Sequence, residues 1–246
     1  PKVIKSGSFV FDSFEKMWRA QYALTRIEPL PYTCLFGCTP PMIALMTGAE
    51  TDQCAVLYAV RGDEEDCELN EKKTRDVCLK YGEPGNEGTN AMAYGMAGHP
   101  DVGMRVMAGT FNVGFLGATD QLFPLDGFLE VFEGVKKILD KWEPKCKELG
   151  IPGLDHVEPM GPNVMYYAVD KVYDGANPEA AKVAHDITVE VAEWAVRAGG
   201  PVYGPTGSLA KMNAMAFSPS YFNLMRTIKH ALDPNNIMNP NNPWGL

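Results

Sequence analysis

Apolar and polar residues follow one another along the chain with two different periods, and each period predicts one type of element. A period of two is typical of strands, and a period near 3.6 is typical of helices. The strand period occurs loosely over residues 2–11 and clearly over 163–172, and residues 32–38, 53–60 and 110–123 are further strand candidates. The helix period occurs over residues 14–27, 63–80, 125–149, 178–198 and 224–232. The pattern therefore predicts two successive rounds of strands and helices.

The order of these elements predicts a fold class. Residues 1–84 read strand, helix, strand, strand, helix, which is most of a split βαβ, ferredoxin-like unit. Residues 104–246 repeat this order, and residues 85–103, rich in Gly, Asn and Met, are expected to form a long irregular connection. We predict one α+β domain over residues 1–246, in which two ferredoxin-like halves share one large antiparallel sheet covered by helices.

Charge and composition exclude several classes of protein. The chain has 22 Lys+Arg against 31 Asp+Glu, a net charge of -9, and no basic cluster, which argues against a nucleic-acid partner. No stretch approaches the ~20 apolar residues of a membrane span. Six cysteines are too few for a disulfide framework, and Cys34 and Cys38 lack zinc-motif spacing. Free thiols and the absence of a signal segment at the first residues lead us to expect a cytoplasmic location.

The end of the chain carries the most specific motifs. Gly199-Gly200, the Gly-rich turn 204–211, the helix 224–232 and the tail Asp233-Pro-Asn-Asn-Ile-Met-Asn-Pro240 follow one another. Asn and Pro in this tail favour turns, so the tail reads at least as a helix stop followed by an extension. Together the motifs resemble the C-terminal cap domain of the FAD-linked oxidases, of the vanillyl-alcohol oxidase and p-cresol methylhydroxylase type.

The resemblance implies a cofactor and partners. In that family FAD is held mainly by an N-terminal domain, which this chain has no room for, and no Gly-x-Gly-x-x-Gly loop is present. We therefore expect FAD to be held mainly by another chain, an FAD-binding subunit, with an electron-acceptor subunit as a further partner of a hetero-oligomer. The resemblance also implies that the tail returns to the flavin domain, with Asn236 and Asn239 contributing to cofactor binding.

Two branches of the family differ in their site residues. The hydroxy-acid dehydrogenases have two metal-ligand histidines where this chain has Glu158 and Met165, and a Glu-His pair where it has Pro205 and Thr206. This disfavours a metal-assisted hydroxy-acid dehydrogenase, and we predict no metal site. The phenol-oxidising branch has a Tyr-Arg pair that binds a phenolate oxygen, and here Tyr203 matches whereas Gly204 replaces the Arg.

Two adjacent tyrosines add evidence that does not depend on the family. Tyr166 and Tyr167 lie on a predicted strand, so one faces the core and the other the opposite side. With Asn163, Tyr203 and Thr206 they would surround a mostly apolar pocket, although ordinary sheet residues would give the same pattern.

We assign roles to these residues as predictions. Tyr203, Tyr167 and His156 are the candidate catalytic residues. The candidate substrate-binding residues are Tyr166, Asn163, Thr206, Met165 and Glu158. The predicted function is that of a substrate-binding cap of an FAD-dependent oxidoreductase that oxidises a phenolic or alcohol substrate by hydride transfer to flavin. The alternatives are a 2-hydroxy-acid dehydrogenase subunit and a catalytically silent cap with an assembly role.

Overall fold

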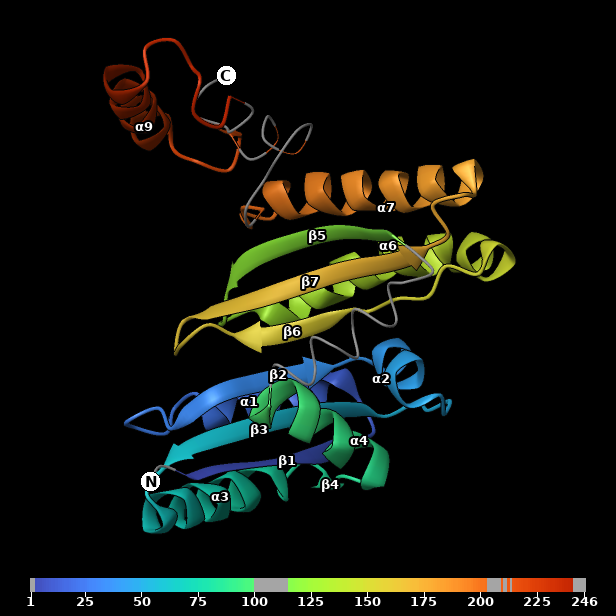
Figure 1. Cartoon of the computed structure of the whole chain (residues 1–246), viewed down its shortest axis with the longest axis vertical. Helices are drawn as coiled ribbons and strands as arrows, with labels where there is room; N and C mark the ends of the chain where they lie inside the picture. The colour runs from blue at the N-terminus through green and yellow to red at the C-terminus, as the bar shows by residue number, and fades with distance from the viewer. Residues whose placement is uncertain (1–2, 100–114, 203–208, 210–211, 213, 241–246) are drawn as a thin grey trace.

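The protein was analysed as a computed structural model that describes residues 3–99, 115–202, 209, 212 and 214–240. The described strands form one seven-stranded sheet in the order β4-β1-β3-β2-β6-β7-β5. All of its strand pairs are antiparallel, and the helices other than α9 lie along the sheet (Figure 1). This confirms an α+β chain built on a single antiparallel sheet.

The longer elements lie where the sequence predicts them, whereas α2, α4, η1, β4 and β6 were not predicted. The strands are β1 (Val3–Phe11), β2 (Tyr32–Cys38), β3 (Cys54–Gly62), β4 (Glu83–Pro84), β5 (Phe115–Pro124), β6 (His156–Pro159) and β7 (Val164–Tyr173). The helices are α1 (Phe14–Leu24), α2 (Pro40–Thr47), α3 (Glu64–Cys78), α4 (Glu87–Met92), the π-helix η1 (Ala93–Gly98), α6 (Phe128–Leu149), α7 (Pro178–Arg197) and α9 (Pro219–Leu232).

Side-chain caps begin several of these helices where the sequence offers them. Ser13 accepts a hydrogen bond from the backbone N–H of Lys16 at the start of α1. Asn177 caps α7, and Pro178 occupies the first helical position, where its missing N–H costs nothing. The first turn of α3 is acidic, which suits the positive end of the helix dipole.

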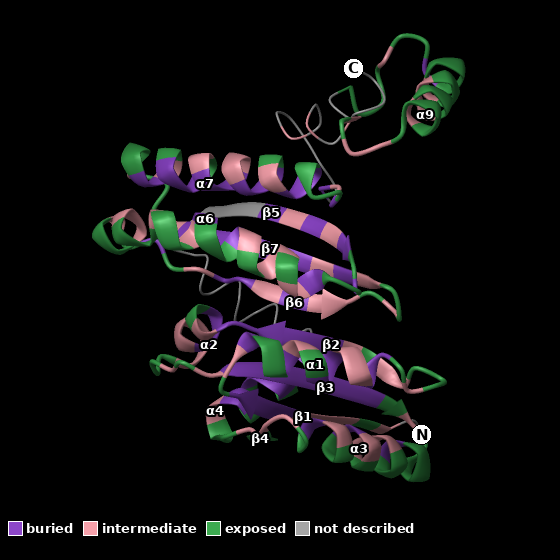
Figure 2. Ribbon diagram, turned by 180° about the vertical axis from the view of Figure 1, so that it is seen from behind, coloured by how far each residue is buried: buried purple, intermediate pink, exposed green. Residues whose placement is uncertain are grey.

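Two hydrophobic cores lie on opposite faces of the sheet. The larger core lies between the strands and the helices α1, α3, α6 and α7, and the smaller one lies beneath α2, α4 and η1. The inner sides of these helices are buried, whereas α9 has no buried residue and lies beyond α7, away from the sheet (Figures 1 and 2).

The two halves of the sheet meet between β2 and β6. Gly37 pairs with Val157 and Cys38 pairs with His156. A Cβ atom on Gly37 would lie 2.7 Å from the side chain of Val157, so only glycine permits this close approach. The Thr39 hydroxyl donates to the backbone oxygen of Asp155 at 2.6 Å and supports the same junction.

The structure differs from the expected irregular connection over residues 85–103. Residues 87–98 form α4 and η1, which together pack on β1 and β3. Asn86 begins this segment by accepting a hydrogen bond from the N–H of Thr89. The wide turns of η1 do not produce the 3.6-residue period, so the pattern of apolar residues does not reveal this helix.

Two finer parts of the predicted fold stay predictions. One is the ferredoxin-like character of each half, which would require four strands in each half. In the first half the fourth strand, β4, has only 2 residues. In the second half the described chain adds, beyond β5, only the isolated bridge from Gln121 to Val202. The other is the return of the C-terminal tail to a flavin domain. The described tail does contain the predicted turns, since Asn236 and Asn239 have positive φ angles of 50° and 47°.

Candidate functional site

Strand β7 places its side chains alternately on two different surfaces. Met165, Tyr167 and Lys171 face the layer of α6 and α7, whereas Tyr166 and Asp170 face the other side of the sheet. Tyr166 and Tyr167 therefore lie on opposite faces, as the strand period predicts.

Neighbouring strands bring further ionisable groups to the face that carries Tyr166. In β6, Glu158 pairs with Tyr166, and His156 pairs with Ala168. In β5, Asp120 also pairs with Ala168, from the other side. Paired residues of an antiparallel sheet share a face. We call the five residues Asp120, His156, Glu158, Tyr166 and Asp170 the sheet-face cluster.

The phenol of Tyr166 is hydrogen-bonded to a carboxylate. Its O–H donates to Asp120. Burial, the charge of Asp120 and this hydrogen bond all raise the pKa of Tyr166. Burial also raises the pKa of Asp120, against the opposing effect of the hydrogen bond from Tyr166. Tyr166 is therefore a neutral hydrogen-bond donor at physiological pH.

Glu158 is an acid that titrates near neutrality. Burial, followed by the charge of Asp120, raises the pKa of Glu158 to about 7. At neutral pH its carboxyl group is therefore divided between the protonated and the ionised form, which suits a group that both accepts and donates protons.

Asp170 has the same property for related reasons. Burial and the charges of Asp120 and Asp155 raise the pKa of Asp170 to about 7, against the lowering effect of Lys171. The residue is 8% exposed, and its Oδ1 atom has no hydrogen-bond partner among the described residues. Buried carboxyl oxygens are normally hydrogen-bonded, so this atom is a ready acceptor or donor for a further group.

His156 is held as a neutral base beside Glu158. Its Nδ1 atom lies 3.0 Å from the backbone oxygen of Leu154, which can only accept, so Nδ1 carries the proton. Its Nε2 atom lies 3.7 Å from Oε1 of Glu158. Burial lowers the pKa of the ring, which is stacked on Phe36 at 4.4 Å between centroids. The lone pair of Nε2 is thus kept available as a proton acceptor.

The cluster can bind and exchange protons on an uncharged substrate. It combines a phenolic donor, a neutral imidazole and carboxyl groups whose pKa values lie near 7. Perturbed ionisable groups gathered on one surface are typical of functional sites. Within the described ranges no group of three or more His, Cys, Asp or Glu side chains is placed to hold a metal ion.

The structure brings some of the predicted site residues together and separates others. Tyr166, His156 and Glu158 belong to the cluster. Tyr167 and Met165 are fully buried on the helix side of β7, and Asn163 is exposed in the turn before this strand. Tyr203 and Thr206 lie outside the described residues.

Asp120 and Asp170 belong to the cluster, although the sequence analysis did not single them out. A signal was present, because Asp120 is the single charged residue of β5, and Asp170 follows the uncharged run Val-Met-Tyr-Tyr-Ala-Val of β7. Burying a carboxylate costs free energy unless the group is paired or hydrogen-bonded, so an acid within a buried strand indicates a functional role.

The predicted cofactor-binding asparagines lie in a tail organised by Asp233. The carboxylate of Asp233 accepts hydrogen bonds from the N–H groups of Ile237 and Met238 and from the ammonium group of Lys229. Hydrogen bonding from Lys229, followed by that from Ile237, lowers the pKa of Asp233 to about 2. The tail is thereby folded back on the end of α9, where Asn236 and Asn239 form its turns.

Comparison with known families agrees with this architecture. The model of the FAD linked oxidases, C-terminal domain, matches residues 1–242. The chain belongs to this family, whose members bind FAD. Within the described part of the chain, no helix combines the length and the apolar character needed to cross a bilayer.

One relative is similar in sequence over part of the chain, and two solved structures are similar in fold over nearly all of it. A segment of 90 residues, 36% of this chain, is 33% identical to the 4-cresol dehydrogenase [hydroxylating] flavoprotein subunit of Pseudomonas putida and covers 17% of that protein. The solved structure of p-cresol methylhydroxylase with substrate bound matches 99% of this chain and 53% of its own, with a TM-score of 0.75 and 19% identity. A 4-ethylphenol oxidase from Gulosibacter chungangensis matches 97% of this chain and 53% of its own, with a TM-score of 0.72 and 17% identity. The chain thus spans about half the length of these solved relatives.

The described residues fit one part of FAD better than another. The sheet-face cluster contains three carboxyl groups, which would repel the pyrophosphate of FAD, and the sequence has no Gly-x-Gly-x-x-Gly loop to hold it. The hydrogen-bond donor and the proton-exchanging carboxyl groups of the same cluster would suit the surroundings of the flavin ring and its substrate better. The residues present would therefore fit the ring end of FAD rather than its pyrophosphate.

Proposed function

We propose that this chain is the substrate-binding cap of an FAD-dependent oxidoreductase that oxidises a phenolic or alcohol substrate. The flavin ring would be carried by an FAD-binding subunit or domain outside these residues, and when bound it supplies the hydride acceptor. The sheet-face cluster would face the substrate. The observation that carries this proposal is the gathering of Tyr166, Glu158 and Asp170 on one face of the sheet, with two carboxyl pKa values near 7.

The residues of the cluster would have distinct tasks. Tyr166 would donate a hydrogen bond to the substrate oxygen in exchange for its bond to Asp120, and so hold the substrate in one orientation. Glu158 in its ionised form would accept the proton of the substrate hydroxyl. His156, with Nε2 unprotonated and 3.7 Å from Oε1 of Glu158, would take up the proton once Glu158 has accepted it.

The phenolic substrate class is supported by the relatives and by one predicted residue. The matched proteins are named for 4-cresol and 4-ethylphenol. Tyr203 stays a candidate for binding the phenolate oxygen, together with Thr206, and both would come from the segment that follows Val202. Asn236 and Asn239 stay candidates for contact with the flavin domain, because they shape the turns of the tail.

Reconstitution with an FAD-binding partner tests this function. The full chain is co-expressed with the partner, and the flavin absorbance of the purified complex is followed anaerobically after addition of 4-methylphenol or an aryl alcohol. We expect the flavin to be bleached by the wild-type complex and much more slowly by Glu158→Gln. A colourless homo-oligomer, or a complex whose flavin none of these substrates reduces, would support the silent cap.

A further inference from the structure

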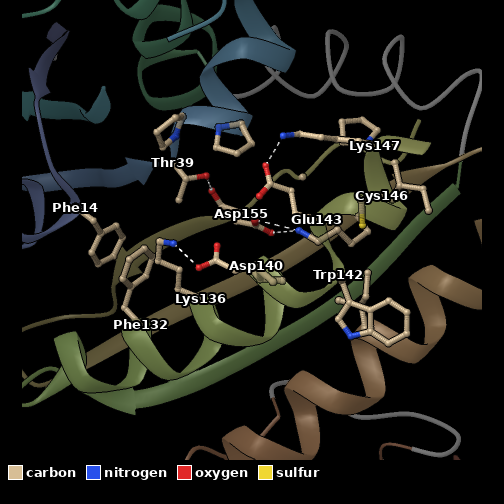
Figure 3. A pocket seen from close by; sticks show the side chains of 18 of the residues that line it. Phe14, Thr39, Phe132, Lys136, Asp140, Trp142, Glu143, Cys146, Lys147 and Asp155 are labelled. Carbon is tan, nitrogen blue, oxygen red and sulfur yellow. Dashed lines mark hydrogen bonds and ion pairs between the residues drawn. The ribbon is translucent and has the colours of Figure 1, made fainter. Parts of the chain in front are cut away.

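A pocket lies on the other side of the sheet from the cluster. It has a volume of about 860 Å³ and opens between α6, the start of α1 and the segment 150–153 (Figure 3). This volume lies within the range of small-molecule sites. Its floor includes Tyr167 and Lys171 of β7, whereas their neighbours Tyr166 and Asp170 face the cluster. The sheet therefore separates the two sites.

The walls of this helix-side pocket are mainly aromatic and aliphatic. Phe132, Leu139 and Trp142 of α6 line it together with Ile187 of α7, and Phe14 of α1 is stacked parallel to Phe132. Aromatic walls favour a flat, largely apolar ligand. Two of the lysines at the rim are paired, Lys136 with Asp140 at 2.6 Å and Lys147 with Glu143 at 2.7 Å, and the further carboxylates Asp52 and Glu133 leave the rim negative (Figure 3).

The floor contains a buried ion pair with hydrogen-bonding capacity left over. The ammonium group of Lys171 donates to the two carboxylate oxygens of Asp155 at 2.8 and 3.0 Å. The side chains are 7% and 8% exposed. An ammonium group has three N–H bonds, and the third finds no acceptor among the described residues. Tyr167, whose side chain is fully buried, is also part of the lining.

These features define the kind of ligand that would fit. A buried ion pair contributes little net stability by itself. An N–H donor that lacks an acceptor beside a pocket is costly unless a ligand accepts its hydrogen bond. An anionic ligand would meet the carboxylate of Asp155, and a cationic one would meet Lys171. A neutral carbonyl or hydroxyl oxygen would accept the third N–H without either repulsion.

We propose that the helix-side pocket binds an uncharged aromatic molecule whose carbonyl or hydroxyl oxygen accepts a hydrogen bond from Lys171. The rings would lie between Phe132 and Trp142, and the hydroxyl of Tyr167 would offer a second polar contact. This site is independent of the proposed oxidation at the sheet-face cluster.

Prodan, an uncharged naphthyl ketone whose fluorescence depends on its surroundings, is a suitable probe for the full chain. We expect a saturable blue shift with the wild-type protein. Cys146→Trp, which fills the pocket from α6, should weaken binding at least about tenfold, which corresponds to about 1.4 kcal/mol. The double variant Lys171→Met/Asp155→Leu removes the oxygen-binding donor without leaving a lone buried charge, and a similar loss is expected.

A matched variant on the opposite face serves as the control. Tyr166→Phe should leave Prodan binding unchanged, since its side chain faces the cluster. Thermal melts confirm that each variant is folded, and Leu139→Trp replaces Cys146→Trp if the latter does not fold. Absence of a saturable signal, equal affinity in a folded pocket-filling variant, or loss of binding in Tyr166→Phe would each overturn the assignment. So would loss of binding on addition of an FAD-binding partner, which would make the pocket a protein interface.

Discussion

Tyr166 and Tyr167 are adjacent in β7 yet serve opposite surfaces of the sheet. Tyr166 donates to Asp120 in the sheet-face cluster, whereas Tyr167 is fully buried against Phe128 of α6, with ring centroids 5.6 Å apart. The pair provides two nearly identical substitutions with different expected results.

Tyr166→Phe should lower the rate of flavin reduction at least about tenfold, or about 1.4 kcal/mol in the activation free energy, because it removes the donor to the substrate oxygen. Stability should change little. Tyr167→Phe should leave the rate within about twofold, because no hydroxyl on the helix side reaches the substrate. Stopped-flow reduction of the reconstituted complex measures both. Equal rates for the two variants would remove Tyr166 from the proposed site.

Glu158→Gln should remove one ionisation from the pH dependence of the rate of flavin reduction. The wild-type rate of flavin reduction is expected to rise as the pH rises through about 7, because burial raises the pKa of Glu158 to that value and only its ionised form accepts a proton. The glutamine variant should be slower and should lack this limb. Glu130→Gln on the exposed side of α6 is the control. If the rate of Glu158→Gln still rises with pH through about 7, the ionisation responsible belongs to another group.

Asp170 should make the protein less stable as the pH rises. Its pKa is about 7 in the folded chain and 3.8 in the reference state, so the folded state holds the proton more tightly. The contribution of this ionisation to the free energy of unfolding is complete below about pH 3.8 and is lost as the pH rises to about 7. Its upper bound is about 1.4 kcal/mol for each unit by which the pKa is raised.

Asp170→Asn should therefore reduce the loss of stability between about pH 4 and pH 7. Urea unfolding of the two proteins across this range measures the difference. Asp126→Asn, at an exposed carboxylate, is the matched control and should follow the wild type. Parallel curves for Asp170→Asn and the wild type would show that Asp170 titrates normally.

The contact between α6 and α7 depends on a glycine. A Cβ atom at Gly134 would lie 1.9 Å from the ring of Trp194 in α7. Gly134→Ala should therefore destabilise the fold by about 1–3 kcal/mol, although alanine favours helices. Glu133→Ala, at the neighbouring exposed position, should be nearly neutral. Chemical denaturation compares the two, and a stabilised Gly134→Ala would show that Trp194 moves aside without cost.

The sequence predicts much of this architecture because most elements have clear periods and caps. The bounds of β2 agree with the predicted strand, and the starts of α1 and α7 agree with their caps. The short strand β6 has only 4 residues and ends in proline, so no period can reveal it. Helix α2 begins with two prolines and is apolar on all sides, so its residues show no helical period. The sequence pattern therefore does not reveal this helix either.

The candidate site is only partly visible in the sequence. The alternation along β7 separates Tyr166 from Tyr167, the family motif points to position 158, and His156 stands out by its place just before the predicted strand. The contribution of Asp120 depends on the register between β5 and β7, which pairs Asp120 with Ala168, 48 positions away. Long-range register follows from packing of the whole sheet, which a local pattern does not contain.

The central claim is that the sheet face carrying Tyr166 closes over a flavin held by another chain or domain. Leu122, which pairs with Tyr166 on this face, and Leu129 in α6 are both half-buried and make a matched pair. Each is replaced in turn by the photo-crosslinker benzoylphenylalanine in the complex with the FAD-binding partner, and mass spectrometry identifies the products. We expect position 122 to crosslink to FAD or to residues beside its ring, and position 129 not to do so. Crosslinks to the flavin region from 129 but not from 122 would contradict the account.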